Sequence, residues 1–110
     1  ALHIAGNLQH FVGAVLGGTE YVRDRPAEFA VRDLPRERVT AELSAAADAV
    51  RRILPGVADD TLRAPYPAPV NDLTVRTDLW LMHLVAHTAF HLGQAGYLRR
   101  CLTGDTTSAH

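Results

Sequence analysis

Cysteine is almost absent from this sequence, and neither sign of charge is in excess. Cys101 is the single cysteine, which excludes a disulfide framework and is typical of a cytoplasmic protein. Because it lies in an apolar context, we interpret Cys101 as a packing residue rather than a reactive thiol. Eleven basic and twelve acidic residues give a formal net charge of −1, which excludes the basic surface of a nucleic-acid-binding protein.

Long hydrophobic runs are missing as well. Residues 1–18 are fairly apolar, but His3, Asn7, Gln9 and His10 interrupt them. That stretch is too polar and too short to span a membrane. No basic segment precedes it, so we expect neither a secretory signal nor a membrane association.

The chain has 110 residues, of which 47% are hydrophobic. This length fits one domain, which we place at residues 1–104, followed by a flexible tail at 105–110. A single core of this size gives modest stability, so a metal ion or a partner subunit would help.

Three segments carry apolar residues at helical spacing, which predicts an all-α protein. The first, residues 2–16, ends at the Gly17-Gly18 pair, since glycine tolerates the left-handed conformation of a helix end. The second, residues 35–54, begins after Asp33, which we expect to cap it, and ends at Pro55-Gly56.

The third helix is expected from residue 77 to about residue 102, with Gly104 as its stop. It is apolar on nearly all sides, so we expect it to be buried on several faces, at the centre of a bundle or at a subunit interface. Its small residues would allow close packing, and Gln94 would need a buried partner. These small residues are Ala86, Ala89, Gly93 and Gly96.

Two connectors join the helices. Residues 19–34 form a long polar connector, in which Pro26 disfavours helix at Arg25. In residues 57–76, three prolines around Tyr66 exclude helix at that point. This second connector is either an ordered crossing loop or a short extended hairpin.

Five of the six histidines fall into two clusters. His83, His87 and His91 follow each other at intervals of four on the third helix, and His3 and His10 flank Asn7 on the first. Residues four apart stack on one helix face, so two imidazoles can point at one ion. Three imidazoles leave room for water, as in a catalytic zinc site, and neutral imidazole also suits Ni, Cu or Fe.

Alternatives to this metal site stay open. Buried histidines are often only hydrogen-bonded core residues, and His83 has rotated away from the face of His91, so we expect it to be a bystander. Glu28 could orient a ligand histidine, but we favour a solvated loop charge. Thr88 stands where the zinc-protease motif has its glutamate base, which excludes that chemistry.

The segment His87-Thr88-Ala89-Phe90-His91-Leu92-Gly93-Gln94, continued by Tyr97-Leu98, resembles the last-helix signature of the DinB/YfiT-like superfamily. Residues 2–8 resemble its metal-ligand helix, and residues 23–29 resemble the connector of one of its branches. The resemblance implies a DinB-like four-helix bundle, often dimeric, with His3, His87 and His91 as metal ligands. The family helix that precedes His3 is missing here, so we expect either a fragment or a partner subunit that covers the gap.

The resemblance also implies an activity, because characterised members are S-transferases and isomerases that use bacillithiol, mycothiol or glutathione. Our leading hypothesis is a metal-dependent thiol S-transferase with Zn or Ni, a homodimer acting on a small molecule. Asn7, His10, His83 and Gln94 would surround its site. The alternative is a non-enzymatic dimerising helical module whose histidines are structural or bind a metal without turnover.

Overall fold

A computed structural model describes residues 1–106, and helices dominate it. The all-α prediction is confirmed, since the described residues contain only two isolated β-bridges and no strand. Two segments are not α-helical: η1 is a π-helix and η2 a single turn of 3₁₀-helix. In chain order the elements are α1 (Leu2–Leu8), η1 (Gln9–Leu16), α2 (Arg25–Ala30), α3 (Arg36–Ile53), η2 (Leu54–Gly56), α4 (Asp59–Arg63) and α5 (Thr77–Thr103).

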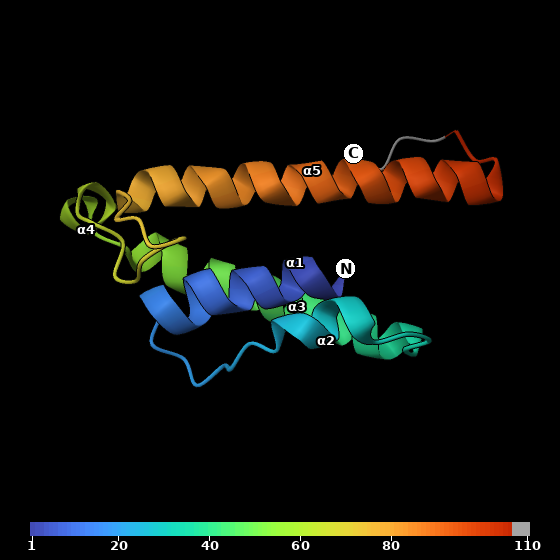
Figure 1. The fold of residues 1–110 in the computed structure, drawn as a ribbon, viewed down its shortest axis with the longest axis horizontal. Helices are drawn as coiled ribbons and strands as arrows, with labels where there is room; N and C mark the ends of the chain where they lie inside the picture. Colours follow the sequence, from blue (N-terminus) through green and yellow to red (C-terminus); the bar gives the residue numbers. More distant parts are fainter. Residues whose placement is uncertain (107–110) are drawn as a thin grey trace.

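The elements form two unequal parts. The continuous α1–η1 helix packs along α3, and α2 packs against α1. The long α5 runs along one side of this group, contacts α1 and the short α4, and extends past the group at its C-terminal end (Figure 1). The N-terminus therefore lies near the middle of α5, which places α1 where it can share a site with that helix.

Small residues allow α1–η1 to approach α3 closely. Ala5, Ala46 and Ala49 are all buried at this contact. A Cβ atom built on Gly17 would overlap the Ile53 side chain, so glycine is needed there for the close approach. Gly18 follows with a φ of 66°, the left-handed end expected of this pair.

The first connector contains a helix that the sequence did not predict, and this helix begins at Arg25, where Pro26 was expected to disfavour it. The Asp24 side chain accepts a hydrogen bond from the Ala27 backbone N–H at 3.1 Å and caps α2, which begins at Arg25. Pro26 is tolerated because a residue in the first turn has no intrahelical partner for its N–H. The expected Asp33 cap is also wrong: Asp33 has a φ of 58°, and Pro35 precedes α3 without a side-chain cap.

The second connector combines α4 with a short extended hairpin. Val70 and Leu73 exchange two backbone hydrogen bonds of 2.9 Å around Asn71 and Asp72, both of which have positive φ. That combination is typical of a tight hairpin turn. Tyr66 is buried here, its hydroxyl donates to the Phe11 carbonyl oxygen at 2.5 Å, and burial raises its pKa. The hairpin alternative was therefore the correct one.

The third predicted helix is confirmed in extent but not in burial. α5 ends at Gly104, which has a φ of 72°, yet only Thr77 and Leu84 are buried along its length. A Cβ atom on Gly93 or Gly96 would meet nothing within 4 Å, so these glycines pack against no described residue. Apolar side chains on α5 are instead exposed, among them Leu79, Met82, Val85, Phe90, Leu92, Tyr97, Leu98 and Leu102.

Two further expectations for α5 are not met within the single chain. Gln94 is exposed, so it needs no buried partner, and Cys101 is exposed rather than packed. Among the described residues, no helix is long and apolar enough to cross a membrane. The predicted tail lies partly outside the described residues, which end at Thr106.

Candidate metal site

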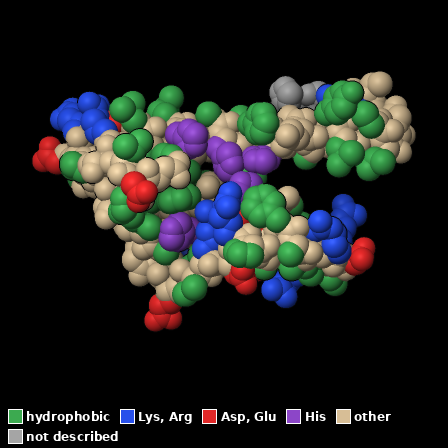
Figure 2. Space-filling model, viewed as in Figure 1, with side chains coloured by type: hydrophobic (Ala, Val, Ile, Leu, Met, Phe, Trp, Pro, Cys, Tyr) green, Lys and Arg blue, Asp and Glu red, His purple; other side chains and the backbone are tan. Residues whose placement is uncertain are grey.

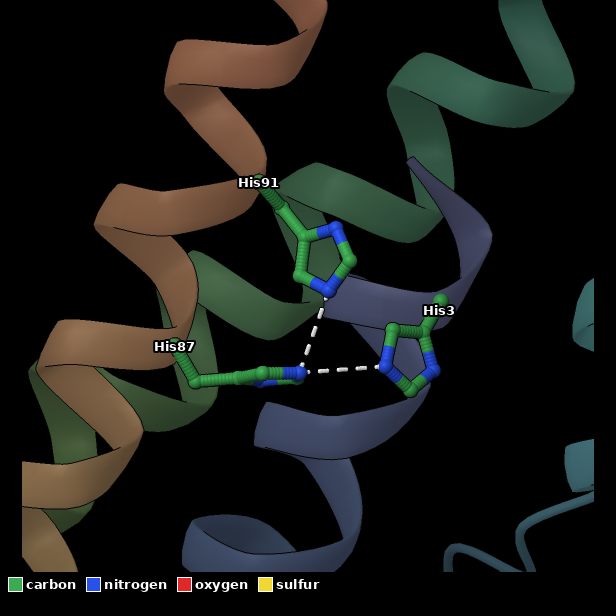
Figure 3. Close-up of side chains that lie close together, drawn as sticks. All are labelled: His3, His87 and His91. Atoms are coloured by element: carbon green, nitrogen blue, oxygen red, sulfur yellow. Dashed lines mark hydrogen bonds between the residues drawn. The ribbon is translucent and has the colours of Figure 1, made fainter.

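Three histidines, from two helices that are far apart in the sequence, converge on one point. His3 projects from α1, while His87 and His91 lie one turn apart on α5 (Figure 3). The Nε2 atom of His87 lies 3.2 Å from Nε2 of His3 and 3.2 Å from Nε2 of His91. The three candidate ligand atoms all lie within 4.8 Å of one another, although His3 and His87 are 84 residues apart in the chain.

The converging nitrogens fit a metal ion better than they fit one another. A single proton on Nε2 of His87 can satisfy one neighbour but not both, so lone pairs face each other in this cluster. Two nitrogens bound to a tetrahedral ion at ~2.0–2.1 Å would lie about 3.3–3.4 Å apart. The distances from His87 to His3 and to His91, 3.2 Å each, are close to this value. The donor set therefore suits a divalent transition metal that prefers imidazole.

A carboxylate behind His3 orients that imidazole. Oε1 of Glu28 lies 3.0 Å from Nδ1 of His3, and only 7% of the Glu28 side chain is exposed. With Nδ1–H donated to Glu28, the lone pair of Nε2 is left for the site. The interpretation of Glu28 as a solvated loop charge is therefore wrong, because α2 turns its side chain inward onto α1.

Arg23 and Gly6 hold this carboxylate in place. Arg23 donates through Nε to Oε2 at 2.8 Å and through a terminal nitrogen to Oε1 at 2.9 Å, a two-pronged pair. A Cβ atom on Gly6 would overlap the same carboxylate, so the missing side chain makes room for it. Sequence reasoning missed both residues, although Gly6 lies three residues after His3 on the same helical face.

The electrostatics favour a charged carboxylate and a neutral imidazole. Burial opposes ionisation of Glu28, but hydrogen bonds and charge from Arg23 and His3 outweigh it and lower its pKa. Burial, followed by the charge of His91 and His3, lowers the pKa of His87. A neutral His87 keeps its lone pair available for a metal near neutral pH.

His87 lacks the orienting contact that His3 has. Its Nδ1 atom is buried and has no hydrogen-bond partner among residues 1–106. Its ring instead lies parallel to that of His83 at 6.2 Å between centroids, and His83 stacks on Trp80 at 4.8 Å. His83 itself stands outside the cluster of three, as the helical rotation predicted.

A cavity of about 460 Å³ adjoins the histidines. Asn7 and His83 line it, together with His3 and His87. In the space-filling view the histidines gather where α5 meets the rest of the molecule, with arginine side chains beside them (Figure 2). The protein thus has room for a small molecule directly next to the candidate metal ligands.

Two residues expected around the site are not found at this cavity. His10 is not among its lining residues and packs edge-on against Phe11, with a pKa lowered by burial and by Arg23. The widened turns of the π-helix bring Phe11 rather than His10 onto the face of His3 and Asn7. Gln94 is also not among the lining residues and is exposed on α5.

Comparison with known protein families identifies the family of this chain. No curated protein and no solved structure matches the chain significantly. The family model described as mycothiol S-transferase matches residues 2–104, which span both helices of the histidine cluster. This match also supports the resemblance noted in the sequence, since that family lies within the DinB/YfiT-like superfamily. The chain therefore belongs to the mycothiol S-transferase family.

Proposed function

We propose that this protein is a metal-dependent thiol S-transferase whose metal is held by His3, His87 and His91. The observation that carries the proposal is the convergence of three Nε2 atoms beside a cavity. Zn or Ni is the expected ion, since imidazole suits both. Mycothiol is the expected thiol, because the matching family model bears that name.

Each part of the chain has a defined task in this proposal. The bound metal supplies Lewis-acid chemistry that favours the thiolate form of a thiol at neutral pH. Glu28 holds the tautomer of His3, and Arg23 keeps Glu28 ionised. The adjoining cavity holds the electrophile next to the site, so that the two reactants meet in a fixed orientation.

Metal analysis of protein purified without a histidine tag tests the site. We expect about one equivalent of a transition metal in the wild type and less than about a tenth in His87→Ala. His10→Ala is the matched control, because His10 packs against Phe11 and does not line the cavity, and it should keep its metal. Unchanged metal in His87→Ala, or none in the reconstituted wild type, contradicts the assignment.

Turnover separates the enzyme from the alternative, a dimerising module that binds metal without catalysis. Metal-loaded protein is mixed with mycothiol and a panel of electrophiles, and loss of the free thiol is followed. We expect turnover that disappears in His87→Ala and persists in His10→Ala. Full metal content without turnover on the whole panel would favour the module.

We also propose that the protein forms a homodimer, in a cytoplasmic setting, through the exposed apolar face of α5. An apolar groove of about 390 Å³ runs between η1, α3 and α5, and its lining includes exposed side chains such as Val85 and Leu92. Exposed apolar surface of this kind typically marks an interaction site. Sedimentation at several concentrations tests the proposal, and a monomer at every concentration contradicts it.

A further inference from the structure

Two arginines but no carboxylate line the cavity beside the histidines. Arg23, Arg25 and three histidines line it, and no acidic residue does. The Arg23 guanidinium is engaged by the Glu28 carboxylate directly behind the cavity wall. A bound divalent metal would add further positive charge, so the field in this cavity favours an anionic ligand.

Unlike Arg23, the second arginine of this cavity, Arg25, forms no ion pair among the described residues. It pairs with no carboxylate among the described residues, and its guanidinium lies 5.3 Å from the centroid of the Phe29 ring. That ring in turn packs against His3 at 4.8 Å between centroids. Arg25 is thus held at the rim of the cavity with its hydrogen-bond donors available to a ligand.

Asn7 supplies an independent sign of a ligand. Its side chain lines the same cavity and is 6% exposed, and its Oδ1 atom has no hydrogen-bond partner among the described residues. A buried acceptor without a donor is costly, so such groups normally meet a partner in the functional state. A ligand N–H or O–H in the cavity would satisfy it.

Aromatic rings complete the wall. Phe11 and Trp80 both line the cavity and meet edge-to-face at 5.0 Å between centroids. Such a wall suits the apolar body of a small molecule whose polar groups face the opposite side.

We propose that this cavity binds the electrophilic substrate through a carboxylate. Arg25 is the cationic partner of that carboxylate, and Oδ1 of Asn7 accepts an N–H or O–H of the same molecule. The role as substrate rests on the proposed transferase function. The binding itself needs only residues of this chain, so it can be measured without metal and without turnover.

Binding of a matched pair of probes to the metal-free protein tests this inference. The probes are hippurate, which has a carboxylate, an amide N–H and a phenyl ring, and hippuramide, its neutral analogue. Metal is first removed with a chelator, and the chelator is then dialysed away, because its own carboxylates could compete with the probes. Affinities are measured by calorimetry or ligand-detected NMR at pH 8. We expect hippurate to bind about tenfold more tightly than hippuramide, as for one charge-assisted contact.

Three variants locate the effect. Arg25→Gln should abolish the preference for hippurate, whereas Arg36→Gln, which removes the same charge at the start of α3 and outside this cavity, should keep it. Asn7→Leu should weaken both probes equally and keep the preference, with circular dichroism confirming its fold. Equal affinity for the two probes, no binding of either, or equal loss in Arg25→Gln and Arg36→Gln would overturn the inference, and none of these results would affect the metal assignment.

Discussion

At the scale of single residues, Glu28 lies between an arginine and an imidazole, in a space that Gly6 leaves open. The carboxylate contacts Nδ1 of His3 on one side and the Arg23 guanidinium on the other. Groups that orient a metal ligand in this way typically change metal affinity by ~10–100-fold when they are lost. We therefore expect metal binding to depend on residues that do not themselves contact the metal.

Gly6→Ala is expected to weaken metal binding without unfolding the protein. The new Cβ atom would overlap the Glu28 carboxylate, which is the end of a flexible side chain and can move away. His3 then loses its orienting contact, and we expect metal affinity to fall by about tenfold or more in a competition titration with a chromophoric chelator. The control is Gly56→Ala, whose Cβ would meet nothing within 4 Å. Unchanged affinity in Gly6→Ala would contradict this role of Glu28.

Glu28 also predicts a pH dependence of stability. Its pKa is lowered in the folded state, so its contribution is fully present above the pKa of the unfolded chain and is lost as the pH falls through the folded value. In metal-free protein, Glu28→Gln should lower the free energy of unfolding by about 1 kcal/mol at pH 7, and by less near pH 3. Urea titrations at both pH values measure this difference.

The control for the pH experiment is Glu20→Gln, since Glu20 is exposed and its replacement should change stability by less than about 0.5 kcal/mol. A destabilisation of Glu28→Gln that is the same at both pH values would show that shape rather than charge matters at this position.

At the scale of elements, the contact between η1 and α3 depends on glycine at one position. Gly17 contacts the Ile53 side chain so closely that any Cβ atom would overlap it. We expect Gly17→Ala to lower the free energy of unfolding by about 1–3 kcal/mol through overpacking. Gly56→Ala is again the control. Urea titrations measure the free energy of unfolding of the two variants. Equal values would mean that Ile53 and α3 can move aside without loss of stability.

The π-helix η1 determines which side chain of the first helix faces the cavity. An α-helix would place His10 two turns after His3 on the same face, whereas η1 places Phe11 at the cavity instead. His10, which was expected to lie around the site, is therefore absent from the cavity lining and is a suitable control. π-helical turns often occur at functional sites, and here the turn determines which side chain faces the cavity beside the histidines.

At the scale of the whole molecule, the proposed metal would join two parts that otherwise touch sparsely. α5 lies against the remaining helices along one side only, and His3, His87 and His91 lie across its contact with α1. A metal that binds only the folded state stabilises it by about 4 kcal/mol when its concentration exceeds the Kd a thousandfold.

Metal removal should therefore lower the Tm by more than about 10 °C for a domain of this size, measured by calorimetry with and without Zn²⁺. His91→Ala should show a much smaller rise in Tm on addition of Zn²⁺, because it lacks one of the three nitrogens. An equal response to Zn²⁺ in the wild type and in His91→Ala would show that the ion stabilises the protein from another site.

The sequence by itself determined the helical class, the extent of the three long helices and the pairing of His87 with His91. Local periodicity carries that information, because residues four apart on any α-helix share a face. The resemblance to a known superfamily added His3, which no spacing could have selected over His10.

Only the tertiary structure decided the surroundings of these histidines. Glu28 reaches His3 because α2 folds back onto α1. Gly6 is important because the Glu28 carboxylate occupies the space where a side chain would be. α5 is exposed where its composition predicted burial. Each of these facts depends on contacts between segments far apart in the chain. Hydrophobic pattern specifies which face of an element is apolar, but not which other element covers it.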